Sequence, residues 1–323
     1  MSQLTSLQLG LQLPAVIDAA GDRARYRFLE FFTAQIRNLN TRRAYVRDVT
    51  QFLDWCAAQD SSDIGGITTL HVAAYVELLT KNHAAPTAKR QLAAIRKFFD
   101  WMVVGQIISA SPAVSVKGPK HSQRRGKTPI LDASEARELL NSIDVGTLIG
   151  LRDRALIGLM VYSFSRVGAA IDMKVEDVIQ RQRRLWVRLQ EKGGKEHEMP
   201  CHHTLETYLD EWLDASGLRN EPKAPLFPTM RRGTGRGSGE LTRARMAQSD
   251  AYLMMRRRSA AAGIAARIGN HSMRGTGITA YLKNGGTLEK ARDMANHSDT
   301  RTTQLYDRRS EDVTLDEVER III

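Results

Sequence analysis

The sequence predicts a mainly α-helical protein with one small β-sheet, divided into an N-terminal four-helix domain and a C-terminal α+β domain. Three observations support this fold class. Apolar residues recur at helical spacing in four segments before residue 103, with short polar stretches between them. A basic stretch without apolar periodicity follows at residues 117–127. Beyond it, one pair of alternating segments stands among further helical patterns.

Length and composition restrict the class of protein and of partner. A chain of 323 residues is long enough for two domains with separate cores. A formal net charge of +11 favours a polyanionic partner, although ribosomal and membrane-surface proteins share this property. The cysteines, Cys56 and Cys201, lie far apart, and no apolar run approaches the roughly twenty residues of a membrane span. We therefore expect a cytoplasmic protein that binds nucleic acid.

Residues 1–21 carry little pattern and are expected to form an N-terminal arm before the helical domain, residues 22–116. The first helix is predicted over residues 22–40, with Tyr26 on its apolar stripe. The second follows an N-cap at Asn40-Thr41 and reaches Cys56. The remaining two are predicted over residues 69–82 and 87–102. Short polar loops between amphipathic helices are typical of a small helical bundle.

Hydroxyl and basic side chains cluster where the second and fourth predicted helices begin. A solvated surface explains a single run of this kind. Two such runs in one domain also match phosphate contacts, since helix N-termini donate free N–H groups to anions. The candidate DNA-binding residues are Thr41, Arg42, Arg43 and Arg47 in the second helix and Thr87, Lys89, Arg90 and Arg96 in the fourth.

Residues 117–127 contain no acidic residue and predict the linker between the domains. Two interpretations remain open for this basic stretch. It is either a plain flexible tether or a segment that follows a DNA backbone. In the second case Lys120, Arg124 and Arg125 would contact DNA.

The C-terminal domain, residues 128–310, begins with a capping-box pattern, Asp132 followed by Glu135, before a helix through residue 142. A longer apolar helix over residues 148–164 leads directly into Arg166. Burying a charge without a partner is costly. The partner of Arg166 is therefore either an internal carboxylate, such as Asp172 or Asp177, or a phosphate.

Alternation of Leu185, Val187 and Leu189 with polar residues predicts a strand over residues 183–190. A second extended run at 196–202 makes a β-hairpin with Lys192 at its tip, where a lysine ordinarily only aids solubility. We expect no cofactor and no metal, because one histidine-rich stretch matches no standard zinc spacing. That stretch contains His197, Cys201, His202 and His203.

Helices are also predicted over residues 204–216 and 249–267. The arginine-glycine stretch between them, residues 229–239, lacks the GKS/T ending of a P-loop and indicates a DNA-facing or disordered insertion. In the tail, residues 311–323, apolar side chains recur at helical intervals. An apolar helix at a terminus often packs on a partner subunit.

Six polar residues of the second domain form the candidate site. His271 and Arg274 share a helix face, and Tyr306 follows His297 by about two and a half turns. Metal-free chemistry on a phosphodiester needs arginines for the non-bridging oxygens, an in-line nucleophile and a proton donor. A tyrosine suits a reversible covalent step. The set is Arg166, Lys192, His271, Arg274, His297 and Tyr306.

The order of these residues resembles the tyrosine recombinase (phage integrase) family. The segments that carry the likeness are residues 150–177, 192–200, 271–274 and 297–306, together with residues 40–45 near the N-terminus. The likeness extends over about residues 22–310. The chain departs from the family pattern at four places. Ser163-Phe164-Ser165 stands where the family commonly has Thr-Gly-Leu, and Ala169 stands where it often has glutamate. Gly275 replaces a frequent histidine, and Ala295-Asn296 replaces Leu-Gly.

The resemblance implies a C-shaped clamp on DNA and site-specific recombination without a cofactor. Tyr306 would form a 3′-phosphotyrosyl link, and Lys192 would protonate the leaving 5′ oxygen. Arg166 and Arg274 would bind the non-bridging oxygens, His297 would hydrogen-bond the phosphate, and His271 would assist proton transfer at the tyrosine. The implied substrate is double-stranded DNA with an inverted-repeat core site. A mobile genetic element would use the reaction for integration, excision or cointegrate resolution.

The resemblance also implies a dimer on one site and a tetramer in synapsis, in some cases with an accessory DNA-binding protein. Two other functions remain open. In the first alternative, the chain is a DNA-binding accessory protein without catalysis. In the second, it is a topoisomerase-like enzyme that relaxes DNA as a monomer. All six chemical positions are filled, which argues against the accessory protein. The helical N-terminal domain and apolar tail argue against the monomeric topoisomerase.

Overall fold

The computed structural model describes residues 13–59, 61, 63–121, 126, 128–191, 194–231, 239–307 and 318–319. It divides into two compact units, residues 1–122 and 123–323, with the boundary inside the predicted linker. The predictions for Arg124, Arg125 and Lys192 fall outside the described residues. So do most of those for the arm, the arginine-glycine loop and the tail.

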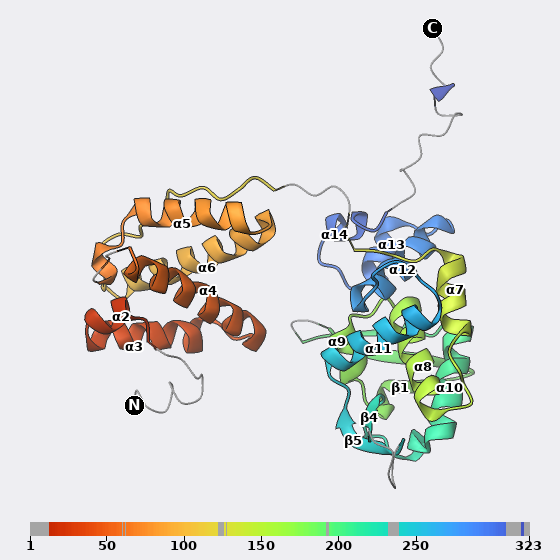
Figure 1. Ribbon diagram of the computed structural model, residues 1–323. Helices are drawn as coiled ribbons and strands as arrows, with labels where there is room; N and C mark the ends of the chain where they lie inside the picture. Colours follow the sequence, from red (N-terminus) through yellow and green to blue (C-terminus); the bar gives the residue numbers. More distant parts are fainter. Residues whose placement is uncertain are drawn as a thin grey trace. The chain divides into compact units, whose positions relative to one another are not determined.

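The N-terminal unit is a helical bundle built around α6, which contacts α3, α4 and α5 (Figure 1). Its core is rich in phenylalanine, and edge-to-face pairs such as Phe28 with Phe98 connect α3 to α6. The helices are α2 (Ala15–Ala19), α3 (Asp22–Glu30), α4 (Leu39–Ala57), α5 (Thr69–Asn82) and α6 (Ala85–Val104), with a π-helix at Phe31–Gln35 and a 3₁₀ turn at Ile64–Gly66.

Three boundaries in this unit differ from the prediction. The first long helix ends at Glu30 and continues as a π-helical turn, which changes the residues that face the core. Tyr26, which lies in α3 before this turn, is 61% exposed and was wrongly placed on the apolar stripe. Asn38 caps α4 in place of Asn40, since its side chain accepts from the backbone N–H groups of residues 40 and 41. Val16 and Ile17 of α2 are buried, so residues 13–21 belong to the bundle.

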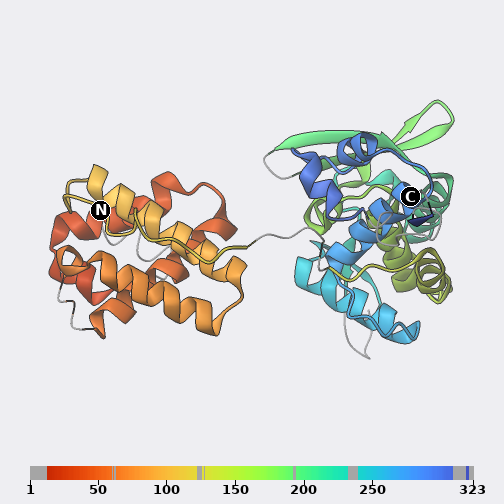
Figure 2. The same cartoon turned by 90° about the horizontal axis from the view of Figure 1, so that it is seen from above.

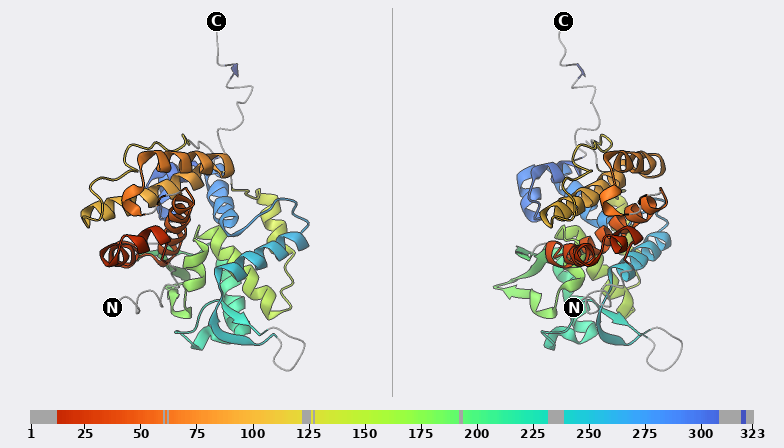
Figure 3. Two further views of the ribbon diagram at one scale, coloured as in Figure 1. Left: turned by 60° about the vertical axis from the view of Figure 1, so that its left-hand side comes forward. Right: turned by 90° about the vertical axis from the view of Figure 1, so that its left-hand side faces the viewer.

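The C-terminal unit combines eight described helices with two small antiparallel sheets. Figures 1 and 3 place the strands β4 and β5 at the opposite end of this unit from α13 and α14. The helices are α7 (Ala133–Asn141), α8 (Leu148–Tyr162), α9 (Val167–Asp172), α10 (His203–Ser216), α11 (Gln248–Ala261), α12 (Asn270–Lys283), α13 (Leu288–Met294) and α14 (Thr300–Gln304). The strands are β1 (Val178–Arg181), β2 (Arg184–Glu191), β3 (Lys195–Pro200), β4 (Pro228–Met230) and β5 (Leu241–Arg245).

Sequence patterns explain the elements that carry the site. The capping box of Asp132 and Glu135 starts α7 as predicted. The apolar helix α8 is the centre of the unit and contacts α7, α9, α10 and α12. Strands β2 and β3 form the predicted hairpin, in which Glu191 pairs with Lys195 next to the turn. Among the described residues, no helix is long and apolar enough to cross a membrane.

Strand β1 and the β4–β5 pair were not predicted. Val178–Arg181 offers only two apolar residues, too few for an alternating pattern. Strands β4 and β5 flank the arginine-glycine stretch, and β5 is mostly exposed. Their pairing depends on backbone contacts across residues 230–241, which composition alone does not indicate.

Candidate active site

Five of the six candidate residues lie on described elements, and the fold gathers them from four segments. Arg166 is the N-cap residue of α9, while His271 and Arg274 lie in the first turns of α12. His297 follows α13, and Tyr306 follows α14. Lys192 lies outside the described residues, directly after the last residue of β2.

Arg274 is the most deeply buried member, with 2% of its surface exposed. Its guanidinium donates to the backbone carbonyls of Phe164 and Ala295, which fix it between the end of α8 and the end of α13. Burial and the charge of Arg166 lower its pKa to about 10. The side chain is still cationic at neutral pH and is held in one orientation before any ligand binds.

Arg166 is half-buried and donates from Nη1 to Oε2 of Glu191. Of the two alternatives for its partner, the structure therefore contains an internal carboxylate, but the specific residues that we named were wrong. Asp172 pairs with Arg245, and Asp177 accepts from the backbone N–H of Lys174. Arg166 lies at the N-terminal end of α9, whereas Asp172 lies at its C-terminal end and Asp177 lies beyond it.

Tyr306 is held by its backbone and by the packing of its ring. Its carbonyl accepts a hydrogen bond of 2.9 Å from Oγ1 of Thr279 on α12. Its ring stacks on that of His297, with centroids 6.3 Å apart and planes 11° from parallel. The residue before it, Leu305, accepts a backbone hydrogen bond of 3.0 Å from Gly126. These contacts hold the Tyr306 ring beside His297.

The two histidines differ in environment but are both neutral at pH 7. Burial, then the charges of Arg274 and Arg166, lower the pKa of His297 to about 4. Its Nδ1 lies 2.9 Å from the hydroxyl of Thr303, which is fully buried. Partial burial and the same two arginines also lower the pKa of His271, although part of its ring faces solvent.

A small cavity of about 190 Å³ is lined by Arg166, by the facing ends of β2 and β3 and by the segment from Asn296 to Thr302, whereas His271 lines a separate cavity. Three basic or polar side chains from different elements face it, namely Arg166, Lys195 and His297. Glu191, Asn296, Ser298 and Thr302 complete its wall. In Figure 2 the strands of the three-stranded sheet run beside the C-terminal helices. A cationic cavity of this size is suited to an anionic group such as a phosphate.

Two polar residues that line this cavity, and a third that contacts His297 beside it, were not among the predicted site residues. Glu191 continues the alternation of Leu185, Val187 and Leu189, so its position on the buried side of β2 was available from the pattern. Lys195 lies opposite it across the hairpin. Thr303 has no recognisable pattern, because its contact with His297 depends on the turn between α13 and α14.

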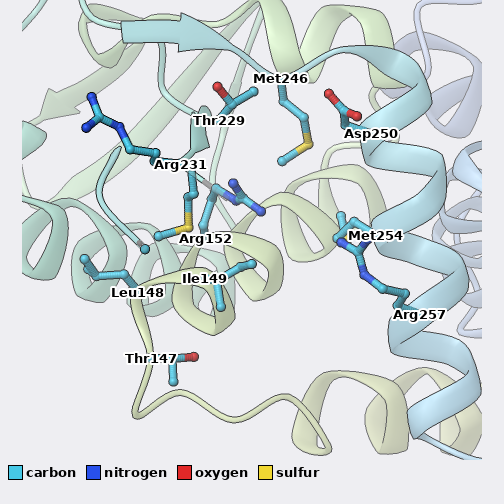
Figure 4. A pocket seen from close by; sticks show the side chains of 12 residues that line it. Thr147, Leu148, Ile149, Arg152, Thr229, Arg231, Met246, Asp250, Met254 and Arg257 are labelled. Carbon is cyan, nitrogen blue, oxygen red and sulfur yellow. The ribbon is translucent and has the colours of Figure 1, made fainter. Parts of the chain in front are cut away.

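A second, larger cavity of about 800 Å³ lies between α8, α11 and the β4–β5 strands (Figure 4). Methionine side chains and Arg152, Arg231 and Arg257 line it, and none of the five described candidate residues does. Arg152 is buried and bonded to Asp153 and to the carbonyl of Pro228. Asp153 is shared with Arg258, so this carboxylate ties two arginines into the fold.

The candidate DNA-binding residues of the N-terminal unit divide into two groups. Three arginines already bond within the unit: Arg90 with the buried Asp48, Arg96 with the carbonyls of Ala113 and Val116, and Arg42 with the carbonyl of Ile36. Thr41 bonds the cap residue of α4. The exposed side chains are Arg43, Arg47, Lys89 and Lys120, while Thr87 is half-buried.

The histidine-rich stretch after β3 has a structural role. His202 caps α10 by accepting from the backbone N–H of Thr204, and its ring stacks on Tyr162. Throughout the described part of the chain, no three histidine, cysteine, aspartate or glutamate side chains form a group that could hold a metal ion.

Residues 129–312 match the phage integrase family, and residues 27–104 match the N-terminal SAM-like domain of phage integrases. The chain is 28% identical to tyrosine recombinase XerD of Corynebacterium glutamicum over 278 residues, which are 83% of this chain and 86% of that protein.

Two solved structures share the fold at low sequence identity. The XerH site-specific recombinase bound to difH substrate has a TM-score of 0.65 at 16% identity, with 99% of this chain and 93% of that chain covered. A lambda integrase dimer bound to a COC′ core site has a TM-score of 0.67 at 17% identity, with 90% and 95% covered.

Proposed function

The chain belongs to the phage integrase family of tyrosine recombinases, and on that premise we propose that Tyr306 cuts and rejoins DNA through a covalent phosphotyrosyl link. The protein is a site-specific DNA recombinase. The observation that carries the assignment of the nucleophile is the stacking of Tyr306 on His297, which lines the same small cavity as Arg166. A phosphate in that cavity would lie between the arginines and the tyrosine.

In the proposed reaction, Oη of Tyr306 attacks the phosphorus and forms a bond to it as the bond to the 5′ oxygen breaks. The phosphorus remains on the 3′ side, and the 5′ oxygen leaves as a hydroxyl after receiving a proton from Lys192. Neutral His271, whose pKa is lowered, accepts the tyrosine proton. The free 5′ hydroxyl of another strand reverses these steps and completes the exchange.

Arg166 and Arg274 stabilise the charge that develops on the non-bridging oxygens. Arg274 is prepared for this role by its two carbonyl contacts, which require no rearrangement when DNA binds. We assign the Thr303 hydroxyl as the donor in its contact with Nδ1 of His297, which places the proton of the neutral ring on Nε2. His297 then donates from Nε2 to the phosphate.

We propose double-stranded DNA with an inverted-repeat core site as the substrate. The exposed Arg43, Arg47, Lys89 and Lys120 contact its phosphates, whereas the three internally bonded arginines maintain the bundle. The lambda integrase structure that shares this fold is a dimer on a core site. We propose the same arrangement here, with the C-terminal tail as the contact between protomers.

The test begins with a DNA site selected by binding from a pool of random duplexes. The selected sequence is synthesised again with a nick, so that the cleaved product is lost and the covalent complex accumulates. Wild-type protein should attach to this DNA, and Tyr306→Phe should bind it without attachment. Attachment by Tyr306→Phe would contradict the assignment. Binding without attachment by wild type would favour the accessory protein, and relaxation of plasmids without the site would favour the topoisomerase.

A further inference from the structure

A buried carboxylate lies between the two arginines of the active site. Glu191, the last residue of β2, has only 3% of its side chain exposed. Its Oε2 accepts a hydrogen bond from Nη1 of Arg166, and its Oε1 lies 3.9 Å from Nη1 of Arg274. Each oxygen of one carboxylate therefore faces a different guanidinium.

The two arginines depend on Glu191 to different degrees. Arg274 is also fixed by the carbonyls of Phe164 and Ala295. Within the described part of the chain, Glu191 is the hydrogen-bond acceptor that the structure gives to the Arg166 guanidinium. Arg166 is also the more exposed of the two, at 33% of its side chain against 3%. Removal of the carboxylate would therefore release Arg166 and leave Arg274 in place.

No nearby carboxylate on α9 can replace Glu191. Ala169 lies one helical turn after Arg166, and Asp172 is paired with Arg245. The strand supplies the negative charge that the helix lacks. Because like charges repel strongly when they are partly buried, two guanidiniums at one cavity need such a charge between them.

We propose that Glu191 is a positioning residue that holds Arg166 beside Arg274 in the orientation needed to bind the scissile phosphate. This inference rests on the proposed function, since it assigns the arginines to phosphate binding. It adds a residue that the six-residue set does not include. It also connects the arginines to the hairpin, because Lys192 is the next residue in the chain.

The test compares Glu191→Gln, which removes the charge at nearly constant size, with Glu191→Asp, which keeps the charge. Glu198→Gln is the matched control, because Glu198 lies in the same hairpin and bonds two arginines, Arg181 and Arg188, outside the cavity. The measured quantities are the rate of covalent attachment to the nicked site at saturating protein, the Kd for that DNA and the thermal unfolding temperature.

We expect Glu191→Gln to slow attachment by about 10–100-fold, as misplaced catalytic groups do, while the Kd changes by less than about threefold. Glu191→Asp should retain more of the rate, and Glu198→Gln should match wild type. Attachment by Glu191→Gln at or above the wild-type rate would overturn the proposal, because it would mean that the carboxylate competes with the phosphate. The proposal would also be overturned if Glu191→Gln lost DNA affinity and unfolding temperature together with the rate, since the role of Glu191 would then be only structural.

A substrate with sulfur in place of the leaving 5′ oxygen distinguishes the arginines from Lys192. A thiol has a pKa of about 8.5, so the sulfur leaves without a proton from the protein. It should restore attachment by Lys192→Ala and leave Glu191→Gln slow. Full restoration of Glu191→Gln would show that Glu191 acts through the lysine and would contradict the role assigned to Arg166. If wild type itself fails to attach, the proposed function fails, whereas wild-type attachment with an unaffected Glu191→Gln rejects this inference alone.

Discussion

The ring of Tyr306 packs directly on the backbone of Gly275 in helix α12. A Cβ atom at Gly275 would lie 3.1 Å from Cε1 and 3.2 Å from Cδ1 of the tyrosine ring, and 2.7 Å from Cγ2 of Ile130. The glycine is thus part of the surface that sets the position of the proposed nucleophile.

Gly275→Ala should slow covalent attachment, because the added methyl group displaces either Ile130 or the Tyr306 ring. A misplacement of about 1 Å can reduce a rate by roughly 100-fold, and we expect a loss of at least about tenfold with little change in DNA affinity. Single-turnover attachment to the nicked site measures the effect. Gly66→Ala, at a glycine with open space around its Cα, is the control and should react normally. A Gly275→Ala protein as fast as wild type would rule out this contact as a determinant of the nucleophile.

The lowered pKa of His297 predicts a contribution to stability that depends on pH. Above pH 6.5 the ring is neutral in both the folded and unfolded states. Between pH 6.5 and about 4 only the unfolded state binds the proton, so stability is lost as the pH falls. The stability of wild type relative to His297→Asn should therefore decrease by about 1–2 kcal/mol between pH 7 and pH 4.5. Urea unfolding of both proteins at these pH values measures the difference, and a constant difference would refute the lowered pKa.

Gly277→Ala should destabilise the C-terminal unit. A Cβ atom at this position would lie 2.0 Å from the backbone oxygen of Val161 and 2.9 Å from the ring of Phe164. Backbone cannot move as readily as a flexible side chain, and overpacking of this kind costs about 1–3 kcal/mol. Thermal unfolding of the purified protein should show the loss. An unchanged unfolding temperature would mean that α8 and α12 are not in such close contact.

Arg90 gives a test that separates folding from DNA contact. Its partner Asp48 is completely buried, and burial raises the pKa of that carboxyl even though Arg90 opposes the shift. Arg90→Ala should cost up to about 3 kcal/mol of stability, because it removes the hydrogen-bonded partner of a buried carboxylate and leaves only Arg47, at 3.8 Å. Arg43→Ala, at an exposed position, should instead weaken DNA binding and leave unfolding unchanged. Reduced DNA affinity with normal stability in Arg90→Ala would return Arg90 to the DNA-binding set.

Much of the fold could be predicted from the sequence, where periodicity is strong. The helix at residues 69–82 and the capping box at Asp132 are confirmed, as is the pairing of β2 with β3 in a hairpin. The elements that were missed have weak local signals. Helix α2 has five residues, and β4 and β5 are short strands separated by a glycine-rich stretch. Their stability comes from contacts with distant parts of the chain.

The members of the candidate site could be proposed from the sequence, whereas their contacts could not. The spacing and order of the six residues identified the chemical groups, since side-chain type restricts chemistry. The prediction of the carboxylate that pairs with Arg166 was wrong. Nearness in sequence favoured Asp172 and Asp177, whereas Glu191 approaches from a strand that lies further along the chain. The sequence also could not distinguish Arg90 and Arg96, which bond within the N-terminal unit, from the exposed basic residues. That difference depends on tertiary contacts.

The measurement that tests the central claim most directly is identification of the amino acid joined to DNA. Wild-type protein is trapped on the nicked site, the DNA is degraded to a short remnant, and the protein is digested with trypsin. The account predicts that the peptide of residues 302–308 carries the nucleotide on Tyr306. An adduct on any other residue, or unmodified Tyr306 in a confirmed covalent complex, would contradict it.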